Sequence, residues 1–279
     1  MVYFIILLSL FLVLYNINMI KRTLYTGMNI MSWDVEYIYP KNTEMTYKYF
    51  ENYIKNLAMD ISSSNPDILV IQNISNGING LKILISVIEK IYNIKYLIYN
   101  ADEMDEEGSV YVISKVKLIN TYRLGKNIHF SFFYNNNSYH IYGVYLYKKI
   151  DYTIKNSNQY NIDILSDFYK IYKDSLKYKN KKVCILGNFN SYYGSKALRT
   201  IHTLGFVNLN YTQKSKKYMY NKYTRNYDNK LEKTFELEHA YVNKKMFNST
   251  KQFIISEKLN QNINFTGNRL IHFQINIIL

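Results

Sequence analysis

The stretch Lys182-Val183-Cys184-Ile185-Leu186-Gly187-Asn188-Phe189-Asn190 decides the fold class of this chain. Its first half is a short apolar run, which predicts a buried strand at residues 182–186. The glycine and asparagines that follow predict a turn, because these residues tolerate left-handed backbone angles. Cys184, the one cysteine of the chain, lies inside the apolar run, and we interpret it as a buried structural thiol. A single cysteine excludes an internal disulfide and a thiol redox pair.

Helices and strands are expected along the whole chain from residue 28 onward, from the periodicity of the apolar residues. The expected helices are residues 44–63, 80–92, 163–179 and 195–204. The expected strands are residues 28–35, 67–72, 109–114, 116–121, 128–134, 139–147, 182–186, 235–242, a segment near Phe253, and 271–278. Since helices flank buried strands, the pattern predicts an α/β fold whose sheets carry helices on their outer faces.

An unbroken apolar stretch, Val2–Tyr15 (VYFIILLSLFLVLY), precedes this region. We expect residues 1–26 to be a signal peptide or an N-terminal membrane anchor, and residues 27–279 to form one domain. No basic residue precedes the stretch and no small-residue cleavage site follows it, so both alternatives stay open. Either one predicts a secreted or membrane-anchored, extracytoplasmic protein.

The composition excludes disorder and says little about partners. Hydrophobic residues make up 48% of the 279-residue chain, which is ample for a core. The net charge is +14, but the basic residues are mostly Lys, and the abundant Asn, Ile, Tyr, Lys and Phe share AT-rich codons. Mutational bias explains this balance without a polyanionic partner. By the same reasoning the Lys- and Tyr-rich residues 212–233 are expected to form a solvated loop, with nucleic-acid stacking as the alternative.

Four short segments carry a resemblance to a known family. In chain order they read NIMSWDVE at 29–36, DILVIQN at 67–73, CILGNFN at 184–190 and HFQI at 272–275. They resemble the motifs of the endonuclease/exonuclease/phosphatase (DNase I-like) superfamily, and weaker similarities lie at 108–115, 142–147 and 237–242. The resemblance covers roughly residues 28–279. It implies a four-layer α/β sandwich, in which two packed mixed β-sheets carry helices on their outer faces.

The resemblance also implies a chemistry, the Mg²⁺-assisted hydrolysis of phosphate esters, but four principal positions have changed. The metal-binding Glu of the family falls on Asn73, which brings no charge to a hard cation. The Asp that polarises water falls on Asn188, which cannot accept a proton. A His falls on Tyr145, and the Asp before the closing His falls on Ile271.

Other positions keep part of the chemistry. Asn190 and His272 match the family, and Glu238 replaces an Asp by its homologue. Asp34 replaces the usual Asn, and Glu36 stands where some members carry a metal-binding carboxylate. The candidate catalytic positions are therefore Tyr145, Asn188, Asn190, Glu238 and His272, and the candidate metal ligands are Asp34, Glu36 and Asn73.

These losses favour a pseudoenzyme, a binding scaffold that needs no cofactor. Its partner is unknown; a phosphate-bearing ligand or a nucleic acid fits the family, and the N-terminal segment implies contact with a membrane. The alternative is a Mg²⁺-dependent phosphodiesterase, acting on nucleic acids or on lipid or inositol phosphates. It would use a smaller site made of four ionisable residues: Asp34, Glu36, Glu238 and His272. Structural interpretations also remain, since Asn188 and Asn190 suit a turn and His272 suits a core position.

Overall fold

In this computed structural model, the residues described are 27–35, 47–74, 76–99, 109–146, 158–191, 195–213, 215–218, 225–227, 230–232, 238–258 and 270–277. Beyond Lys251, strands are described by their backbone alone. The apolar stretch Val2–Tyr15 and the metal-ligand candidate Glu36 therefore lie outside the described residues. Within them, no helix is long and apolar enough to cross a membrane.

A seven-stranded mixed sheet forms one half of the sandwich, in the order β10-β14-β15-β1-β2-β4-β3. Its strands are β1 (Met28–Asp34), β2 (Ile68–Gln72), β3 (Leu97–Tyr99), β4 (Val110–Ser114), β10 (Ser215–Tyr218), β14 (Thr250–Lys258) and β15 (Leu270–Ile277). The central strands β1 and β2 are parallel, whereas β15 pairs with β1 in the antiparallel direction.

A six-stranded mixed sheet forms the other half, in the order β5-β6-β7-β8-β13-β9. Its strands are β5 (Thr121–Leu124), β6 (Asn127–Tyr134), β7 (Asn137–Tyr145), β8 (Lys182–Asn188), β9 (Val207–Asn208) and β13 (Glu238–Val242). Here β7 and β8 are parallel, and β13 is antiparallel to β8. A separate two-stranded ribbon joins β11 (Arg225–Tyr227) and β12 (Lys230–Glu232).

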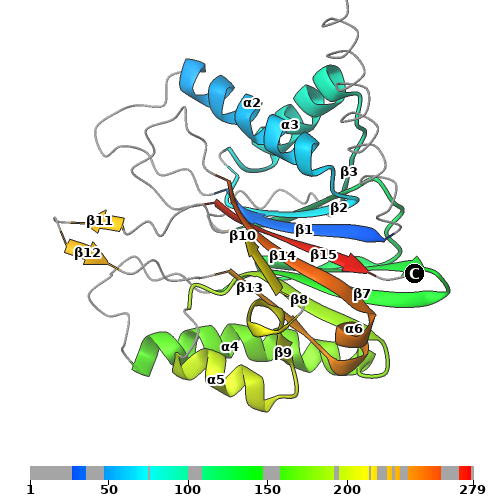
Figure 1. The fold of residues 1–279 in the computed structure, drawn as a ribbon, viewed down its shortest axis with the longest axis vertical. Helices are drawn as coiled ribbons and strands as arrows, with labels where there is room; N and C mark the ends of the chain where they lie inside the picture. The colour runs from blue at the N-terminus through cyan, green and yellow to red at the C-terminus, as the bar shows by residue number, and fades with distance from the viewer. Residues whose placement is uncertain are drawn as a thin grey trace, which may run out of the picture.

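Helices cover the outer face of each sheet (Figure 1). On the seven-stranded sheet these are α2 (Tyr47–Ser64) and α3 (Gly77–Tyr92). On the six-stranded sheet they are α4 (Asn158–Ser175) and α5 (Lys196–Thr203). The shorter helices are η2 (Leu176–Tyr178), η3 (Leu209–Tyr211) and α6 (Lys244–Ser249). This arrangement confirms the predicted four-layer α/β sandwich.

Alternate residues of each central strand pack in different core layers, because successive side chains of a strand point to opposite faces of the sheet. In β1, Ile30 packs between the two sheets, whereas Met31 packs under α2 and α3. Both faces are buried, so these strands read as continuous apolar runs rather than as alternating ones. The sheets approach closely at Gly143 of β7, where an added Cβ would lie 2.6 Å from Cγ1 of Val70.

Several predicted elements need correction. The strand expected at 116–121 is wrong: the carbonyl of Val116 accepts from the hydroxyls of Ser114 and Tyr99, and the strand β5 begins only at Thr121. The loop expected at 212–233 is wrong in part, because β10, β11 and β12 lie within it. The helix expected from residue 80 begins at Gly77, where the N–H of Gly80 bonds to the carbonyl of Asn76. Strands β3 and β9 and helix α6 were not expected.

Candidate functional site

The candidate residues meet where four strands end. Asp34 is the last residue of β1, and Asn73 follows β2. In the facing sheet Tyr145 ends β7 and Asn188 ends β8. The two parallel pairs run in the same direction, since side chains at the ends of β1 and β8 touch each other across the sandwich.

The carboxylate of Asp34 is the centre of this arrangement. Its Oδ1 accepts a hydrogen bond of 2.9 Å from Nδ2 of Asn73, and its Oδ2 accepts one of 2.5 Å from Nδ2 of Asn188. Asp34 is 9% exposed and Asn188 is 5% exposed. Hydrogen bonds to an ionised acceptor are the stronger kind, and burial strengthens them further. The amides at two positions where the resemblance implies carboxylates therefore bind Asp34, which stands where the resemblance implies an Asn.

The orientation of the Asn188 amide is fixed by its neighbour. The backbone N–H of Asn190 can only donate, and it bonds to Oδ1 of Asn188 at 2.6 Å. The amide oxygen must therefore face Asn190, which leaves the NH₂ group for Asp34. Asn190 has a left-handed backbone with φ of 48°, and its Nδ2 donates to the carbonyl of Leu146 at 2.8 Å. Its turn role is thus supported, whereas Asn188 still belongs to β8.

A second carboxylate, Glu238, lies beside Asp34. It begins β13, opposite Asn188 in the sheet register, and it is 5% exposed. Its Oε1 accepts from the backbone N–H of Asp34 at 2.8 Å. Asn210 supports it from behind, because Nδ2 of Asn210 donates to the carbonyl of Glu238 at 2.9 Å. Glu238 therefore holds the end of β1 against β13.

Tyr145 takes part in the core between the two sheets. Its ring belongs to the core cluster between the two sheets, and the residue is only 6% exposed. Its backbone N–H bonds at 2.8 Å to Oδ1 of Asn127, a buried residue that sequence reasoning missed. At the position where the resemblance implies a His, this chain has a buried Tyr that packs in the core.

The remaining candidates are placed only in part. The backbone of His272 in β15 pairs with Trp33 of β1. Since Trp33 directly precedes Asp34, His272 lies at the same end of the sheet as the candidate site. The His272 side chain and the whole of Glu36 lie outside the described residues. Trp33 is 1% exposed and packs under the outer helices, in agreement with a packing role.

A supporting layer behind the site also escaped sequence reasoning. His239 follows Glu238, and its Nε2 donates to the carbonyl of Ser191 at 2.9 Å. Its Nδ1 then accepts from Nδ2 of Asn208 at 3.2 Å, which fixes the neutral tautomer. These contacts tie the turn after β8 to β9 and β13. The alternation of Asn with apolar residues at 207–210 was the available signal.

The described residues offer a Mg²⁺ ion two buried carboxylates, Asp34 and Glu238, and amides at two positions where the resemblance implies carboxylates. Mg²⁺ requires nearly octahedral oxygen ligation and commonly binds one or two carboxylates directly. Here both oxygens of Asp34 and Oδ1 of Asn188 already accept hydrogen bonds, and the Asp34 carboxylate faces two NH₂ groups. Each Asp34 oxygen keeps a second lone pair, so a cation there would share the carboxylate with the two amides, which add no charge to the site. Over the described part of the chain, no group of three or more His, Cys, Asp or Glu residues could hold a metal ion.

Similarity to known proteins is detected through structure. No family model matches the sequence, and no curated protein matches it. An endonuclease/exonuclease/phosphatase family protein from Leptotrichia buccalis superposes with a TM-score of 0.63 at 15% identity, over 91% of this chain and 100% of that one. A protein described in the same way from Bacteroides thetaiotaomicron gives 0.62 at 10% identity, over 91% and 99%.

A third solved structure is D. rerio TDP2 complexed with a single-strand DNA product. It superposes with a TM-score of 0.62 at 11% identity, over 91% of this chain and 100% of that one. These likenesses establish the fold, which is that of the endonuclease/exonuclease/phosphatase proteins. At such low sequence identity the activity of this chain does not follow from these structures, because proteins of one fold have many functions.

Proposed function

We propose that this protein uses the endonuclease/exonuclease/phosphatase fold as a binding scaffold and does not hydrolyse phosphate esters. One observation carries the proposal. The carboxylate of Asp34 is bound on both oxygens by the amides of Asn73 and Asn188. The resemblance assigns a metal-binding Glu to position 73 and a water-polarising Asp to position 188, and both positions now hold amides that donate to an anion.

The exchange of residue types between positions 34 and 188 supports this interpretation. The family resemblance implies Asn at the first position and Asp at the second, whereas this chain has Asp34 and Asn188. The carboxylate has thus moved to the strand β1, and the amide at 188 cannot take a proton from water. Losing the group that activates water removes a step that hydrolysis needs.

A phosphate-bearing ligand is the partner class that we favour for the scaffold. Amide N–H groups donate to phosphate oxygens without a metal, and the NH₂ groups of Asn73 and Asn188 each carry a second N–H beside the one that binds Asp34. The N-terminal apolar segment would direct the scaffold out of the cytoplasm, either as a secreted protein or as one anchored to a membrane.

The test is turnover by the purified full-length chain in mild detergent. With Mg²⁺ present, we expect no hydrolysis of DNA, RNA, abasic DNA, sphingomyelin or phosphoinositides above the level of the His272→Ala variant. Removing one preorganised transition-state stabiliser typically lowers kcat by roughly 10²–10³. Turnover that needs Mg²⁺ and disappears in the variant would refute the proposal.

One observation favours the alternative, a phosphodiesterase with a reduced site. Asp34 and Glu238 are both buried carboxylates, and a 2.8 Å hydrogen bond joins Glu238 to the backbone of Asp34. If this pair sufficed for catalysis, Asp34→Ala and Glu238→Ala would each abolish Mg²⁺-dependent turnover. Rates that are unchanged in both variants would exclude the alternative.

A further inference from the structure

The end of the sandwich opposite the candidate site presents exposed apolar and basic side chains. Among them Ile91 of α3 is 57% exposed and Leu97 of β3 is 61% exposed. We define the basal patch by its exposed large apolar residues: Ile91, Tyr92, Leu97 and Ile119. Large apolar side chains that gather on a surface commonly mark a contact with a partner or a membrane.

The sheet register shows that this patch lies at the end away from Asp34. Leu97 pairs with Ser114, Ser114 with Ile68, and Ile68 with Ile30, so these residues form one row across the sheet. Ile30 is near the start of β1, whereas Asp34 is its last residue. Ile119 lies beside the same strand β3, since the N–H of Leu118 bonds to the hydroxyl of Tyr99 at 3.2 Å.

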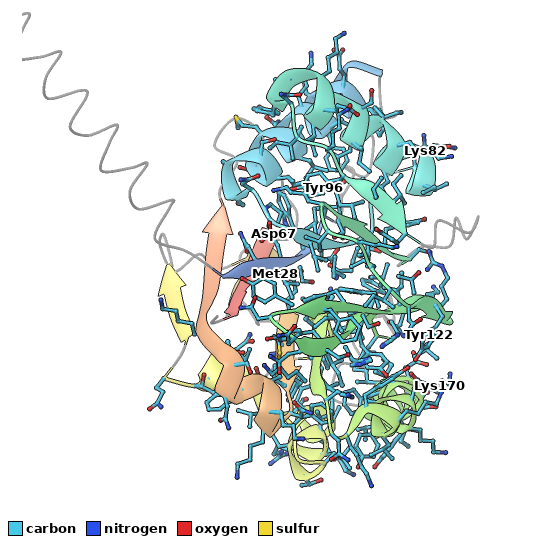
Figure 2. The ribbon with its side chains drawn as sticks, turned by 90° about the vertical axis from the view of Figure 1, so that its right-hand side faces the viewer. Met28, Asp67, Lys82, Tyr96, Tyr122 and Lys170 are labelled. Atoms are coloured by element: carbon cyan, nitrogen blue, oxygen red, sulfur yellow. The ribbon has the colours of Figure 1, made fainter. Side chains whose placement is uncertain are left out.

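Strand β1, which follows the N-terminal segment in the sequence, begins at this same end. The backbone N–H of Asn29 bonds to Oδ2 of Asp67 at 2.8 Å, and the hydroxyl of Tyr96 bonds to the carbonyl of Pro66 at 2.8 Å. Figure 2 accordingly places Met28, Asp67 and Tyr96 together. Three strand spacings separate Ile30 from Leu97, a distance of about 14 Å. A membrane that holds residues 2–15 is therefore within reach of the patch.

The charges around the basal patch suit an anionic surface. Lys90, Lys95 and Lys117 are exposed at this end. The exposed acid Glu89 is offset by Lys95, whose Nζ lies 3.4 Å from its carboxylate. Lysines next to apolar and Tyr side chains are typical of surfaces that rest on anionic lipids.

We propose that the basal patch rests on an anionic lipid bilayer, so that the candidate site faces away from the membrane. The N-terminal segment would tether the chain, and the patch would fix the orientation of the domain. This inference requires the membrane tether but not the absence of hydrolysis. Its failure is therefore distinguishable from failure of the scaffold proposal.

The test compares two positions of matched exposure in the full-length chain. Ile91→Cys reports on the patch, and Ile162→Cys is the control, because Ile162 on α4 is 54% exposed. The control lies near the end that carries the candidate site. Phe168, which follows Ile162 on α4, packs against Phe189 just after β8. Cys184 is fully buried, so an environment-sensitive thiol dye will label the introduced cysteine.

Each labelled protein is incorporated into phosphatidylcholine vesicles that contain phosphatidylglycerol. We expect iodide to quench the dye at position 91 at least about threefold less than the dye at position 162. Adding Leu97→Asp should remove this protection. High salt, or vesicles of phosphatidylcholine alone, should weaken it, because lysine attraction to lipid is screened.

Three results would overturn the inference. The first is equal quenching at both positions in the anionic vesicles. The second is protection of position 91 that persists in detergent and rises with protein concentration, because a second copy of the chain would then cover the patch. The third is a full-length protein that does not float with the vesicles.

Discussion

Acid should destabilise this protein through a pair of buried histidines far from the candidate site. His129 of β6 and His140 of β7 lie side by side, with Nε2 of His129 at 3.3 Å from Nδ1 of His140. Nε2 of His140 contacts the hydroxyl of Ser138 at 2.8 Å, and the ring of Tyr178 stacks on both imidazoles. Two neutral rings satisfy these contacts, with His129 donating to His140.

Protonation is unfavourable in this environment. Burial, and then the proximity of His140 and Lys177, lowers the pKa of His129 to about 4, although Asp174 acts in the opposite direction. Burial, and then Lys181, lowers the pKa of His140 to about 4 as well. A new proton on Nδ1 of His129 would find no acceptor among the described residues. Below pH 6.5 the unfolded chain therefore binds protons that the folded chain does not bind.

The sign and size of the effect follow from proton linkage. The histidine contribution to stability is intact above pH 6.5 and decreases as the pH falls towards 4. For His129 alone, the difference between 6.5 and about 4 corresponds to at most about 3 kcal/mol. Asp174 loses its contribution only at lower pH, because Lys177, Tyr122 and Tyr142 donate to it and its pKa lies below its ordinary value.

The assay is urea unfolding of the full-length chain and of His129→Phe between pH 7 and pH 4.5. We expect the free energy of unfolding of the wild type to decrease over this interval, and the decrease to be smaller in the variant by about 1–3 kcal/mol. Ile128→Val on the same strand β6 is the control, because it changes a buried apolar side chain and removes no titratable group. Equal pH dependence in the wild type and in His129→Phe would refute the reasoning.

Three further predictions concern stability and reactivity. Gly187→Ala should lower the free energy of unfolding by about 2–4 kcal/mol, because φ is 140° and the new Cβ would lie 2.1 Å from the carbonyl oxygen of Val144. Gly125→Ala, with positive φ but open space, should cost about 1 kcal/mol, and equal losses in urea unfolding would contradict this. Asn127→Ala should cost about 1–3 kcal/mol, since it leaves the buried N–H of Tyr145 without its acceptor, whereas the exposed Asn137→Ala should be nearly neutral by the same measurement. Burial raises the pKa of the Cys184 thiol, so Ellman's reagent should react with it only in denaturant, and fast reaction with the native protein would show that the thiol is accessible.

Much of the fold was predictable because the central strands are buried on both faces. Residues 67–72 and 182–186 read as apolar runs between helices, and the structure places β2 and β8 there. Cys184 is buried between the sheets, as its apolar neighbours indicated. The prediction of strands failed where contacts with distant residues outweighed the strand preference of the local sequence. Val116 is an example, since its carbonyl bonds to side chains instead of to a neighbouring strand.

The residue types of the candidate site were predictable, but their contacts were not. The sequence shows that Asn73 and Asn188 lack charge, yet Asn188 meets Asp34 across a separation of 154 residues. The direction of its amide depends on the backbone N–H of Asn190, which no pattern of side chains encodes. Likewise, the contact between His129 and His140 arises from the register of β6 and β7.

The most direct test of the scaffold account is calorimetric titration of Mg²⁺ into the full-length chain and into the triple variant Asp34→Asn, Asn73→Glu, Asn188→Asp. The variant restores the residue types that the family resemblance implies at these positions and removes the amide donors that now face Asp34. We expect no measurable Mg²⁺ binding by the wild type and measurable binding by the variant. Tight Mg²⁺ binding by the wild type that is abolished by Asp34→Ala would contradict the account.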